Sequence, residues 1–406
     1  MTGLFLPLHD EERMILHRLP ALIEKVFPLP ERFRHTVPKN VAELSRLLTS
    51  ARTERGSSYL GKPALLSAYL RYFLPWNIYR LCRLLSSLQI TLKPSDTIID
   101  LGSGPLTLAV ALWISRPDLR KIPLEFKCID KTSAVMEAGK KLFMALSASG
   151  NGKAPCPWKL TTIKGEIKLN GKLSVQIRGK PSALTTAVNI YNEIFWNFSP
   201  ADTEDLKYFT ERQASLLSSL TDQAGSILVV EPGIPRSGEF ISSLRSCLME
   251  RNIFPLSPCT HSLPCPFPGG QSGDTNYRKK EKWCHFAFDT DNAPEELHRL
   301  SAASGIPKER AVLSFLLASQ TPAQPDPGSK KENIRIISDS FPLDSDKSGS
   351  GRNWGRYGCS ESGMILVTGG RRDLELSPSG ALEEHSINKN KIDSKSGALV
   401  VNKDPS

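Results

Sequence analysis

Four cysteines in the second half of the chain form a pattern that could hold a metal. Cys259 and Cys265 are six residues apart, Cys284 follows, and Cys359 comes much later. Thiolates are soft ligands, and four of them suit a zinc ion or an iron–sulfur cluster. The spacing lacks both the CxxC pair of structural zinc ribbons and the CxxCxxC run of bacterial ferredoxins. The spacing alone therefore leaves the identity of the metal open.

Two histidines beside these cysteines provide an alternative. His261 and His285 could complete a mixed cysteine and histidine site for zinc. Free, buried thiols are the second alternative, and this interpretation suits the four remaining cysteines, which are Cys82, Cys128, Cys156 and Cys247. In a reducing compartment, clustered cysteines favour metal binding or catalysis over disulfides.

A glycine-containing loop earlier in the chain predicts a nucleotide-type binding site. Asp100, Gly102, Ser103 and Gly104 lie where a short apolar strand meets the helical stretch LTLAVALWI. Glycines at such a junction let the backbone turn tightly and approach a ligand. Asp130 ends the next predicted strand, where a carboxylate can accept hydrogen bonds from the ribose of an adenosine cofactor. The pattern is shared by dinucleotide-binding folds and S-adenosylmethionine (SAM) methyltransferases. The alternative is a turn that merely connects two elements.

Two features around this loop bear on catalysis. Leu106 stands where a third glycine is usual, and we expect its side chain to narrow the site. The segment VNIYNE, residues 188–193, ends a later strand at the rim of the site. It is neither an NPPY-type motif nor a Pro-Cys pair, so no catalytic base or nucleophile is assigned. Asn192 and Glu193 could equally cap the helix that follows.

The elements that must position these residues alternate between strands and helices from about residue 96. This alternation predicts an α/β fold with a doubly wound, mostly parallel sheet. Asn170-Gly171 predicts a two-residue hairpin turn, because both residues tolerate positive φ. The segments AVLSFLLAS and SGMILVTGG are expected to supply the closing strands.

Changes in composition divide the chain into five predicted regions. Apolar residues at helical spacing mark the first region, whereas the third is rich in Pro, Gly and Cys and needs a staple to be stable. The last region is polar, which predicts disorder. The regions are N-terminal helices (1–92), a Rossmann core (93–254), a cysteine-rich metal lobe (255–292), closing strands with the fourth cysteine (293–375) and a disordered tail (376–406).

The overall composition narrows the class of partner. The 406 residues are 39% hydrophobic and 23% charged, as in a globular protein, and the net charge of +10 favours nucleic acid as a partner over a membrane. Because no run of about eighteen apolar residues occurs, no membrane span is expected. The apolar start is soon followed by acidic residues, which fits neither a secretory signal nor a mitochondrial presequence. A cytoplasmic location is therefore expected.

Five segments, in a fixed order, resemble a known family. They are DLGSGP, VNIYNEI, LVVEPGIPRSGEFISSLR, SPCTHSLPCP and WCHF. They resemble the mitochondrial small-ribosomal-subunit methyltransferase-like assembly proteins and their bacterial relatives, over about residues 58 to 375. The resemblance identifies this chain as a bacterial member of that family.

The resemblance implies a SAM-methyltransferase-like Rossmann fold with an N-terminal helical segment and an inserted cysteine-rich metal lobe. It also implies SAM as a cofactor and a 4Fe–4S cluster. The cluster ligands would be Cys259, Cys265, Cys284 and, within CSESG, Cys359, with the two histidines as neighbours. The implied partners are the small ribosomal subunit and its rRNA, and neither DNA nor a membrane is expected. The chain departs from the family at Leu106 and in longer loops before Cys284 and Cys359, which look like insertions tolerated at small entropic cost.

Three functions remain open from the sequence. The chain could be an rRNA methyltransferase active in ribosome assembly or translation. It could be a catalytically inactive assembly scaffold, or a zinc-stabilised RNA-binding module. In each case a basic loop is expected to contact RNA phosphates, together with two arginines near the fourth cysteine. These residues are Arg278, Lys279, Lys280 and Lys282, and Arg352 and Arg356.

Overall fold

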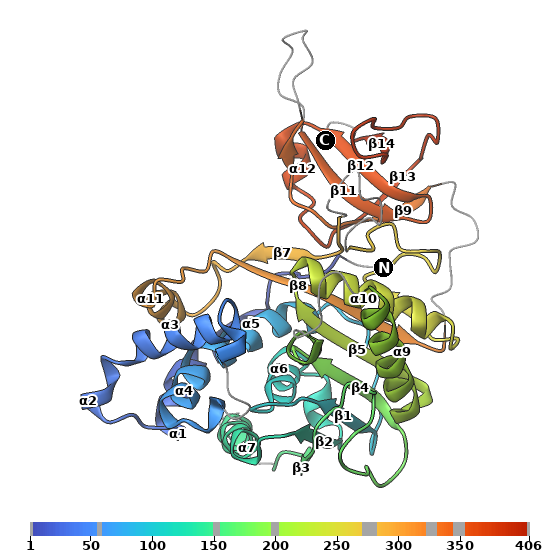
Figure 1. The fold of residues 1–406 in the computed structure, drawn as a ribbon. Coiled ribbons are helices and arrows are strands. Elements are labelled where there is room, and N and C mark those ends of the chain that lie inside the picture. Colours follow the sequence, from blue (N-terminus) through green and yellow to red (C-terminus); the bar gives the residue numbers. More distant parts are fainter. Residues whose placement is uncertain are drawn as a thin grey trace.

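The computed structural model places most of the chain in two sheets and their helices. It describes residues 3–54, 59–148, 155–195, 203–269, 282–321, 331–343 and 354–403. An eight-stranded sheet forms the α/β core, a layer of N-terminal helices covers part of it, and a six-stranded sheet follows at the C-terminal end (Figure 1).

The core sheet has the order β3-β2-β1-β4-β5-β8-β6, with β7 also paired to β8. Its strands are β1 (Thr97–Leu101), β2 (Glu125–Asp130), β3 (Lys159–Lys164), β4 (Ser182–Val188), β5 (Thr221–Pro232), β6 (Phe254–Ser257), β7 (Phe286–Asp289) and β8 (Arg310–Ser319). The first five strands are parallel, whereas β8 runs antiparallel to β5, β6 and β7. The predicted doubly wound, mostly parallel sheet is thus confirmed, and its order reverses between β1 and β4.

Alternating apolar residues bury both faces of this sheet. In β1, Ile98 packs into one hydrophobic cluster and Ile99 into the cluster on the opposite face. Helices cover each face, with α6 and α7 on one side and α9 and α10 on the other (Figure 1). The helices of the core are α6 (Thr107–Ser115), α7 (Ser133–Ala148), α8 (Tyr191–Ile194), α9 (Thr203–Leu220), α10 (Pro235–Met249) and α11 (Glu295–Ala303).

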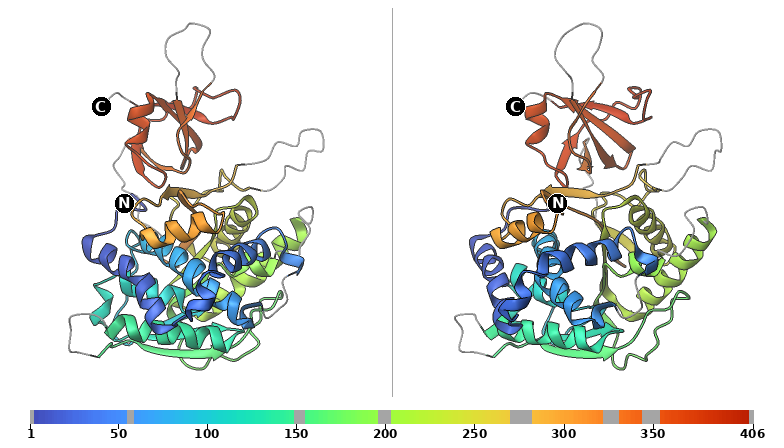
Figure 2. Two further views of the ribbon diagram at one scale, coloured as in Figure 1. Left: turned by 90° about the vertical axis from the view of Figure 1, so that its left-hand side faces the viewer. Right: turned by 60° about the vertical axis from the view of Figure 1, so that its left-hand side comes forward.

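The N-terminal helices pack outside α6 as an additional layer (Figure 2). They are α1 (Asp10–Val26), α2 (Glu31–Arg34), α3 (Val37–Leu48), α4 (Pro63–Ala68) and α5 (Leu74–Leu85). A π-helical turn, Tyr69–Phe73, joins α4 to α5. Such turns widen a helix locally and are frequent at functional sites. Here the turn brings Tyr69 to the largest cavity described below.

The C-terminal part forms a separate sheet with the order β13-β9-β11-β12-β14, and β10 pairs with β11. Its elements are β9 (Glu332–Ile336), β10 (Phe341–Pro342), β11 (Trp354–Ser360), β12 (Gly363–Gly369), α12 (Arg371–Glu375), β13 (Leu382–His385) and β14 (Leu399–Asn402). Ile334, Ile336, Ile365, Val367 and Val401 form its own small core. Figure 1 shows this sheet standing beyond the core at the side of β7 and β8.

Two sequence expectations need correction here. The segment SGMILVTGG does not close the core sheet, because it forms β12 of the second sheet. The segment after residue 376 is not simply disordered, because β13 and β14 form there and lie at the two edges of that sheet. Both strands have only four residues, and most of their side chains are not buried. Their polar composition therefore concealed them. Among the helices of the described ranges, none is long and apolar enough to span a membrane.

Candidate cofactor pocket and cysteine site

The glycine loop between β1 and α6 adopts the tight turn that its sequence predicts. Gly102 and Gly104 have φ values of +69° and +50°, in the left-handed region that favours glycine. A Cβ atom on Gly102 would lie 2.7 Å from the side chain of Ile190. The Ser103 hydroxyl donates a hydrogen bond of 2.7 Å to the backbone oxygen of Asp100, which closes the turn. Nothing lies within 4 Å of a Cβ built on Gly104, so the backbone there faces open space.

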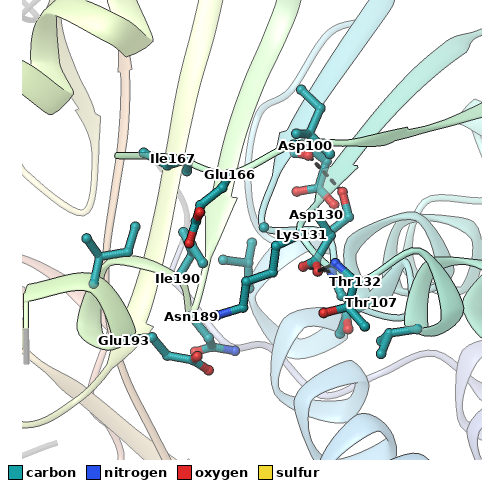
Figure 3. A pocket seen from close by; sticks show the side chains of 18 of the residues that line it. Asp100, Thr107, Asp130, Lys131, Thr132, Glu166, Ile167, Asn189, Ile190 and Glu193 are labelled. Atoms are coloured by element: carbon teal, nitrogen blue, oxygen red, sulfur yellow. Dashed lines mark hydrogen bonds between the residues drawn. The ribbon is translucent and has the colours of Figure 1, made fainter. Parts of the chain in front are cut away.

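Asp130, at the end of β2, fastens this loop. Its Oδ2 accepts the backbone N–H of Gly104 at 3.0 Å, and its Oδ1 accepts the backbone N–H of Thr132 at 2.8 Å. Figure 3 shows Asp130 and Thr132 next to each other at the cavity. Each carboxylate oxygen keeps a second lone pair, so both remain able to accept a further hydrogen bond. Asp130 therefore has a structural role in addition to the ligand contact that its sequence position predicts.

A cavity of about 650 Å³ opens beside the loop. Asp100, Gly102, Ser103, Gly104 and Asp130, the five residues predicted to bind a cofactor, all line it. Its other walls come from the ends of β2 and β4, from two tyrosines of the N-terminal layer, and from the turn at residues 165–170. The cavity lies at the carboxyl ends of β1, β2 and β4, where the strand order reverses. Open α/β sheets bind ligands at this position.

Acidic side chains outnumber basic ones on the cavity wall, with Asp100, Asp130, Glu166 and Glu193 against Lys131 and Lys168. Burial raises the pKa of Asp100 to about 7, while the hydroxyl of Thr186, which donates to Asp100 at 2.7 Å, opposes the rise. Burial also raises the pKa of Asp130. Figure 3 shows both carboxyl groups on one side of the cavity, with Glu166, Asn189 and Glu193 across from them. A positively charged ligand in the cavity would favour the ionised forms of these acids.

Leu106 does not narrow the cavity, contrary to the expectation from the sequence. Its backbone is left-handed, with φ of 55°, as the usual glycine would be. Its side chain is fully buried in the hydrophobic cluster under α6 and is absent from the cavity wall. Packing of the buried leucine side chain thus offsets the strain of the left-handed backbone, and the pocket stays open.

The rim at the end of β4 is organised by two buried charged residues that the sequence interpretation missed. Glu231, the acid of the EPG segment, accepts the backbone N–H groups of Tyr191 at 2.8 Å and Asn192 at 3.1 Å. It therefore caps α8, the role that had been considered for Asn192 and Glu193. Arg80 of α5 donates to the side-chain oxygen of Asn189 at 2.6 Å. The sequence signal for Glu231 was an acidic residue at the end of the apolar run SILVVEP.

The structure gathers the four candidate cysteines between the core and the C-terminal sheet. Cys259 and Cys265 lie in the loop after β6, Cys284 precedes β7, and Cys359 belongs to β11 of the second sheet. Burial is the main cause that raises the pKa of Cys284, and the thiolate forms of the other three cysteines raise it further. Burial likewise raises the pKa of Cys359, and Cys259 and Cys265 add to the rise. Such mutual effects require the four sulfur atoms to be close together.

Two deeply buried arginines flank this group. Arg245 of α10 and Arg335 of β9 are each 3% exposed. Arg335 donates to the backbone oxygens of Pro258 at 3.0 Å and Gly380 at 2.7 Å, and so joins the two parts of the chain. Both arginines counteract the rise in the pKa of Cys259 and Cys359. The positive charges would stabilise a bound group of negative charge.

The two histidines are placed differently. His261 Nε2 lies 3.2 Å from Cys359 Sγ, whereas the ring of His285 stacks on Trp283 with centroids 4.8 Å apart. Within the described ranges, no three His, Cys, Asp or Glu side chains are arranged to hold a single metal ion. All eight cysteines are free thiols.

Most of the basic loop predicted to contact RNA falls outside the described residues, namely Arg278, Lys279, Lys280 and also Arg352. Lys282 is described, and its Nζ lies 4.4 Å from the ring centroid of Tyr357. Arg356 is only 2% exposed, so it cannot contact an RNA backbone at the surface. The part of the prediction that concerns Arg356 is therefore wrong. In β11 Arg356 is buried, whereas the next residue, Tyr357, is only partly buried.

Comparison with solved structures identifies methyltransferases as structural neighbours. A SAM-dependent methyltransferase from Geobacter sulfurreducens in complex with S-adenosyl-L-homocysteine is 11% identical, with 60% of this chain and 90% of that chain covered and a TM-score of 0.30. A putative class I SAM-dependent methyltransferase from Listeria monocytogenes is 10% identical, with 79% and 90% covered and a TM-score of 0.34. These scores are low, and the fold assignment rests on the strand order of the core sheet.

The comparison with families gives a more specific result. No match was found among curated proteins. One family model matches part of the chain. The matched segment runs from α9 to β10, and it contains Glu231 and three of the four candidate cysteines. It ends before Cys359 and begins after the glycine loop. Residues 203–341 match the model of the family described as mitochondrial small ribosomal subunit Rsm22, in agreement with the family that the sequence motifs resemble.

Proposed function

We propose that this chain is a methyltransferase-like factor for small ribosomal subunit assembly or translation. It binds SAM in the cavity beside the glycine loop, holds a 4Fe–4S cluster between its two sheets, and contacts the rRNA of the small subunit. The observation that carries the proposal is the cavity at the carboxyl ends of β1, β2 and β4, which is lined by every residue predicted to bind the cofactor.

The geometry of the cavity supports SAM as its ligand. The Gly102–Gly104 turn gives close access to the backbone, and Asp130 keeps free lone pairs for ribose hydroxyls. The acids on the wall, Asp100 among them, suit the positive charge of a sulfonium group. The family name and the net charge of +10 support a ribosomal RNA partner. Eight free thiols support a reducing compartment such as the cytoplasm.

The donor set of the second site fits an iron–sulfur cluster. Four thiols are soft ligands for iron, and Arg245 and Arg335 supply positive charge beside them. A cluster occupies the space between its ligands, so its cysteines stand farther apart than the ligands of one ion. The mutual effects of these thiols on the pKa values of Cys284 and Cys359 support their grouping around one such cluster. When bound, the cluster would cross-link the segments of the chain that carry its cysteine ligands.

Metal analysis tests the cluster. Protein purified without air should be brown and contain about four iron and four sulfide per chain. Changing Cys284 or Cys265 to serine should remove the colour, because a ligand is lost. Cys156→Ser is the matched control, since Cys156 is also half-buried but lies outside the site, before β3. Stoichiometric zinc without sulfide would instead support the zinc-stabilised RNA-binding module.

Calorimetry tests the cofactor. SAM should bind to the wild type, and Asp130→Ala should weaken binding by about 1–3 kcal/mol, because buried polar groups lose a partner. The variant also releases the N–H of Gly104, so a folded control is needed. Glu250→Ala serves, since Glu250 is an exposed acid that does not line the cavity, and this variant should bind SAM like the wild type. If SAM produces no heat with the folded wild-type protein, the cofactor assignment is wrong.

A methyl-transfer assay separates the enzyme from the scaffold. SAM labelled on its methyl group is incubated with the protein and with small-subunit rRNA. Positioning alone can supply much of the rate of such a transfer, since the sulfonium is already activated. Label in the RNA that disappears with Asp130→Ala would support an rRNA methyltransferase. SAM binding without label would support a scaffold that uses the cofactor structurally.

A further inference from the structure

A second cavity lies on the same edge of the core sheet, on the other side of the β4 rim. Its volume is about 320 Å³, and its walls come from α5, from the segment after β5 and from the start of β8. Because β8 runs antiparallel to β5, its first residues lie at the carboxyl end of β5. The two cavities therefore open on one edge, the first at β1, β2 and β4 and the second at β5 and β8.

The wall of the second cavity carries three basic side chains, and Lys308 is the one without an acidic partner among the described residues. The Nζ atom of Lys308 lies 5.5 Å from the ring centroid of Trp76 and 5.7 Å from that of Tyr72. Among the described residues, no carboxylate or other acceptor is within hydrogen-bonding distance of this amine. Arg310 differs, because it forms a bidentate ion pair with Asp339.

Arg80 adds a second cation close to Lys308. Its two terminal nitrogens donate to Val312 O at 3.1 Å and to the side chains of Asn77 and Asn189, and its buried Nε has no partner within the described residues. Burial and, to a smaller extent, the like charge of Arg80 together lower the pKa of Lys308 to about 8. Glu231 attracts Arg80, whereas Arg80 is the charged group found to act on Lys308 among the described residues. A bound anion would relieve the repulsion between the two cations.

We propose that the second cavity binds a phosphate group of a single RNA strand whose acceptor nucleotide reaches the SAM pocket. Lys308 supplies the direct contact, since its three N–H donors are free to turn toward an anion. Arg80 supplies charge and connects the two cavities, because its partner Asn189 lines the first one. The choice of a polynucleotide over a small phosphate rests on the proposed function and on the net charge of +10.

Binding of a labelled single-stranded RNA of about twelve nucleotides tests this proposal. The full-length protein is compared with Lys308→Met, which keeps the apolar stem over the two rings but removes the charge. Affinity at about 0.1 M salt should fall about fivefold, and the slope of log affinity against log salt should become shallower by about 0.7, which is the value for one phosphate contact. Lys308→Arg should restore most of the affinity. Lys159→Met, an exposed lysine on the far edge strand β3, should change neither quantity.

Inorganic phosphate provides a second readout. At equal ionic strength, phosphate should compete with RNA more strongly than chloride for the wild type but not for Lys308→Met. If RNA affinity and salt slope are unchanged in folded Lys308→Met, the proposal is overturned. If only the phosphate effect is lost, the cavity takes free phosphate and the polynucleotide assignment is overturned. SAM calorimetry on the same variants tests the cofactor proposal separately from the RNA proposal, because Lys308→Met should bind SAM like the wild type. A wild type that fails to bind SAM would contradict the cofactor proposal without affecting the RNA result.

Discussion

At the residue scale, Leu106 shows how one position can serve the core rather than the site. Its left-handed backbone costs a leucine about 1–2 kcal/mol relative to glycine. Burial of the side chain, which is completely removed from water, is worth more than that cost. Sequence comparison with a glycine-rich loop suggests an obstructed pocket, because the sequence does not show on which side of the turn the side chain lies.

Leu106→Gly should therefore destabilise the protein and leave the cofactor pocket unaffected. Loss of the buried side chain costs about 2–5 kcal/mol, and relief of the left-handed backbone returns about 1–2 kcal/mol. We expect a net loss of about 1–3 kcal/mol in the free energy of unfolding, measured by denaturant titration. Leu106→Ala is the control. It keeps the strain and loses the side chain, so it should be less stable than the glycine variant. A glycine variant more stable than the wild type would contradict this account.

Glu231 should make stability depend on pH. Burial raises its pKa from 4.5 to about 8, so between these values the folded protein binds a proton that the unfolded chain has released. The stabilising contribution is complete below about pH 4.5 and is lost as the pH rises through about 8. The free energy of unfolding of the wild type should therefore fall more steeply between pH 5 and pH 8 than that of Glu231→Gln. The difference in slope should approach about 1 kcal/mol per pH unit.

The comparison between the two proteins cancels the contribution of other groups, such as Asp100, whose pKa is also raised. Glu231→Gln is expected to be less stable throughout, because a glutamine has one oxygen to accept the two N–H groups at the start of α8. The slope rather than the absolute stability is the relevant measurement. Parallel curves for the two proteins would show that Glu231 is ionised in the folded state.

At the element scale, the position of α7 depends on one glycine. A Cβ atom on Gly139 would lie 2.2 Å from the backbone carbon of Pro105, in the loop that lines the cofactor cavity. The helix thus touches the loop directly. Asp130, which precedes α7, is hydrogen-bonded to the same loop through Gly104. Strand, loop and helix therefore hold the cavity wall as one unit.

Gly139→Ala should push α7 away from the loop and lower the free energy of unfolding, which is the opposite of the effect that helix propensity predicts. In a helix interior, alanine is normally more favourable than glycine by about 1 kcal/mol. Here the clash with backbone atoms cannot be relieved by a side-chain rotation, so we expect a net loss of about 1–3 kcal/mol in stability. SAM affinity should fall as well, measured by calorimetry. Ala138→Gly, the neighbouring position, should lower stability slightly without weakening SAM binding. A stabilised Gly139→Ala would contradict the close contact.

The elements also show what sequence patterns can and cannot predict. Strands buried on both faces, such as β1 and β5, contain short apolar runs (II in β1 and ILVV in β5), and their alternation with helices predicted the core sheet correctly. Short strands with exposed faces, such as β13 and β14, lack such a run and were missed. The roles of Arg80 and Glu231 depend on contacts between segments far apart in the sequence, which no local pattern encodes.

At the scale of the whole molecule, several contacts connect the C-terminal sheet to the core, among them the ion pair of Arg310 with Asp339. Two further joints lie at the cysteine site and at the N-terminal segment. The first is the cysteine site, where Cys359 of β11 and Arg335 of β9 meet the loop after β6. The second is the N-terminal segment. The N–H of Leu4 donates to Gly380 O at 2.9 Å, and Phe5 stacks on Phe288 of β7 with ring centroids 4.9 Å apart. The proposed cluster would strengthen the first joint alone, since the second contains no cysteine.

Loss of the cluster should therefore loosen the C-terminal sheet while leaving the core sheet intact. In Cys359→Ser, one ligand is lost and the buried charges of Arg245 and Arg335 lose the anionic group that we propose they face. Hydrogen exchange measured by mass spectrometry should become faster in β9 and β11, because their amides depend on this joint. Exchange in β1 and β4 should not change, since buried central strands open only with the whole domain. Cys156→Ser should retain the wild-type pattern in both sheets. If iron is lost from Cys359→Ser and exchange in β9 and β11 stays slow, the cluster is not needed to hold the second sheet in place, and the other contacts with the core are sufficient.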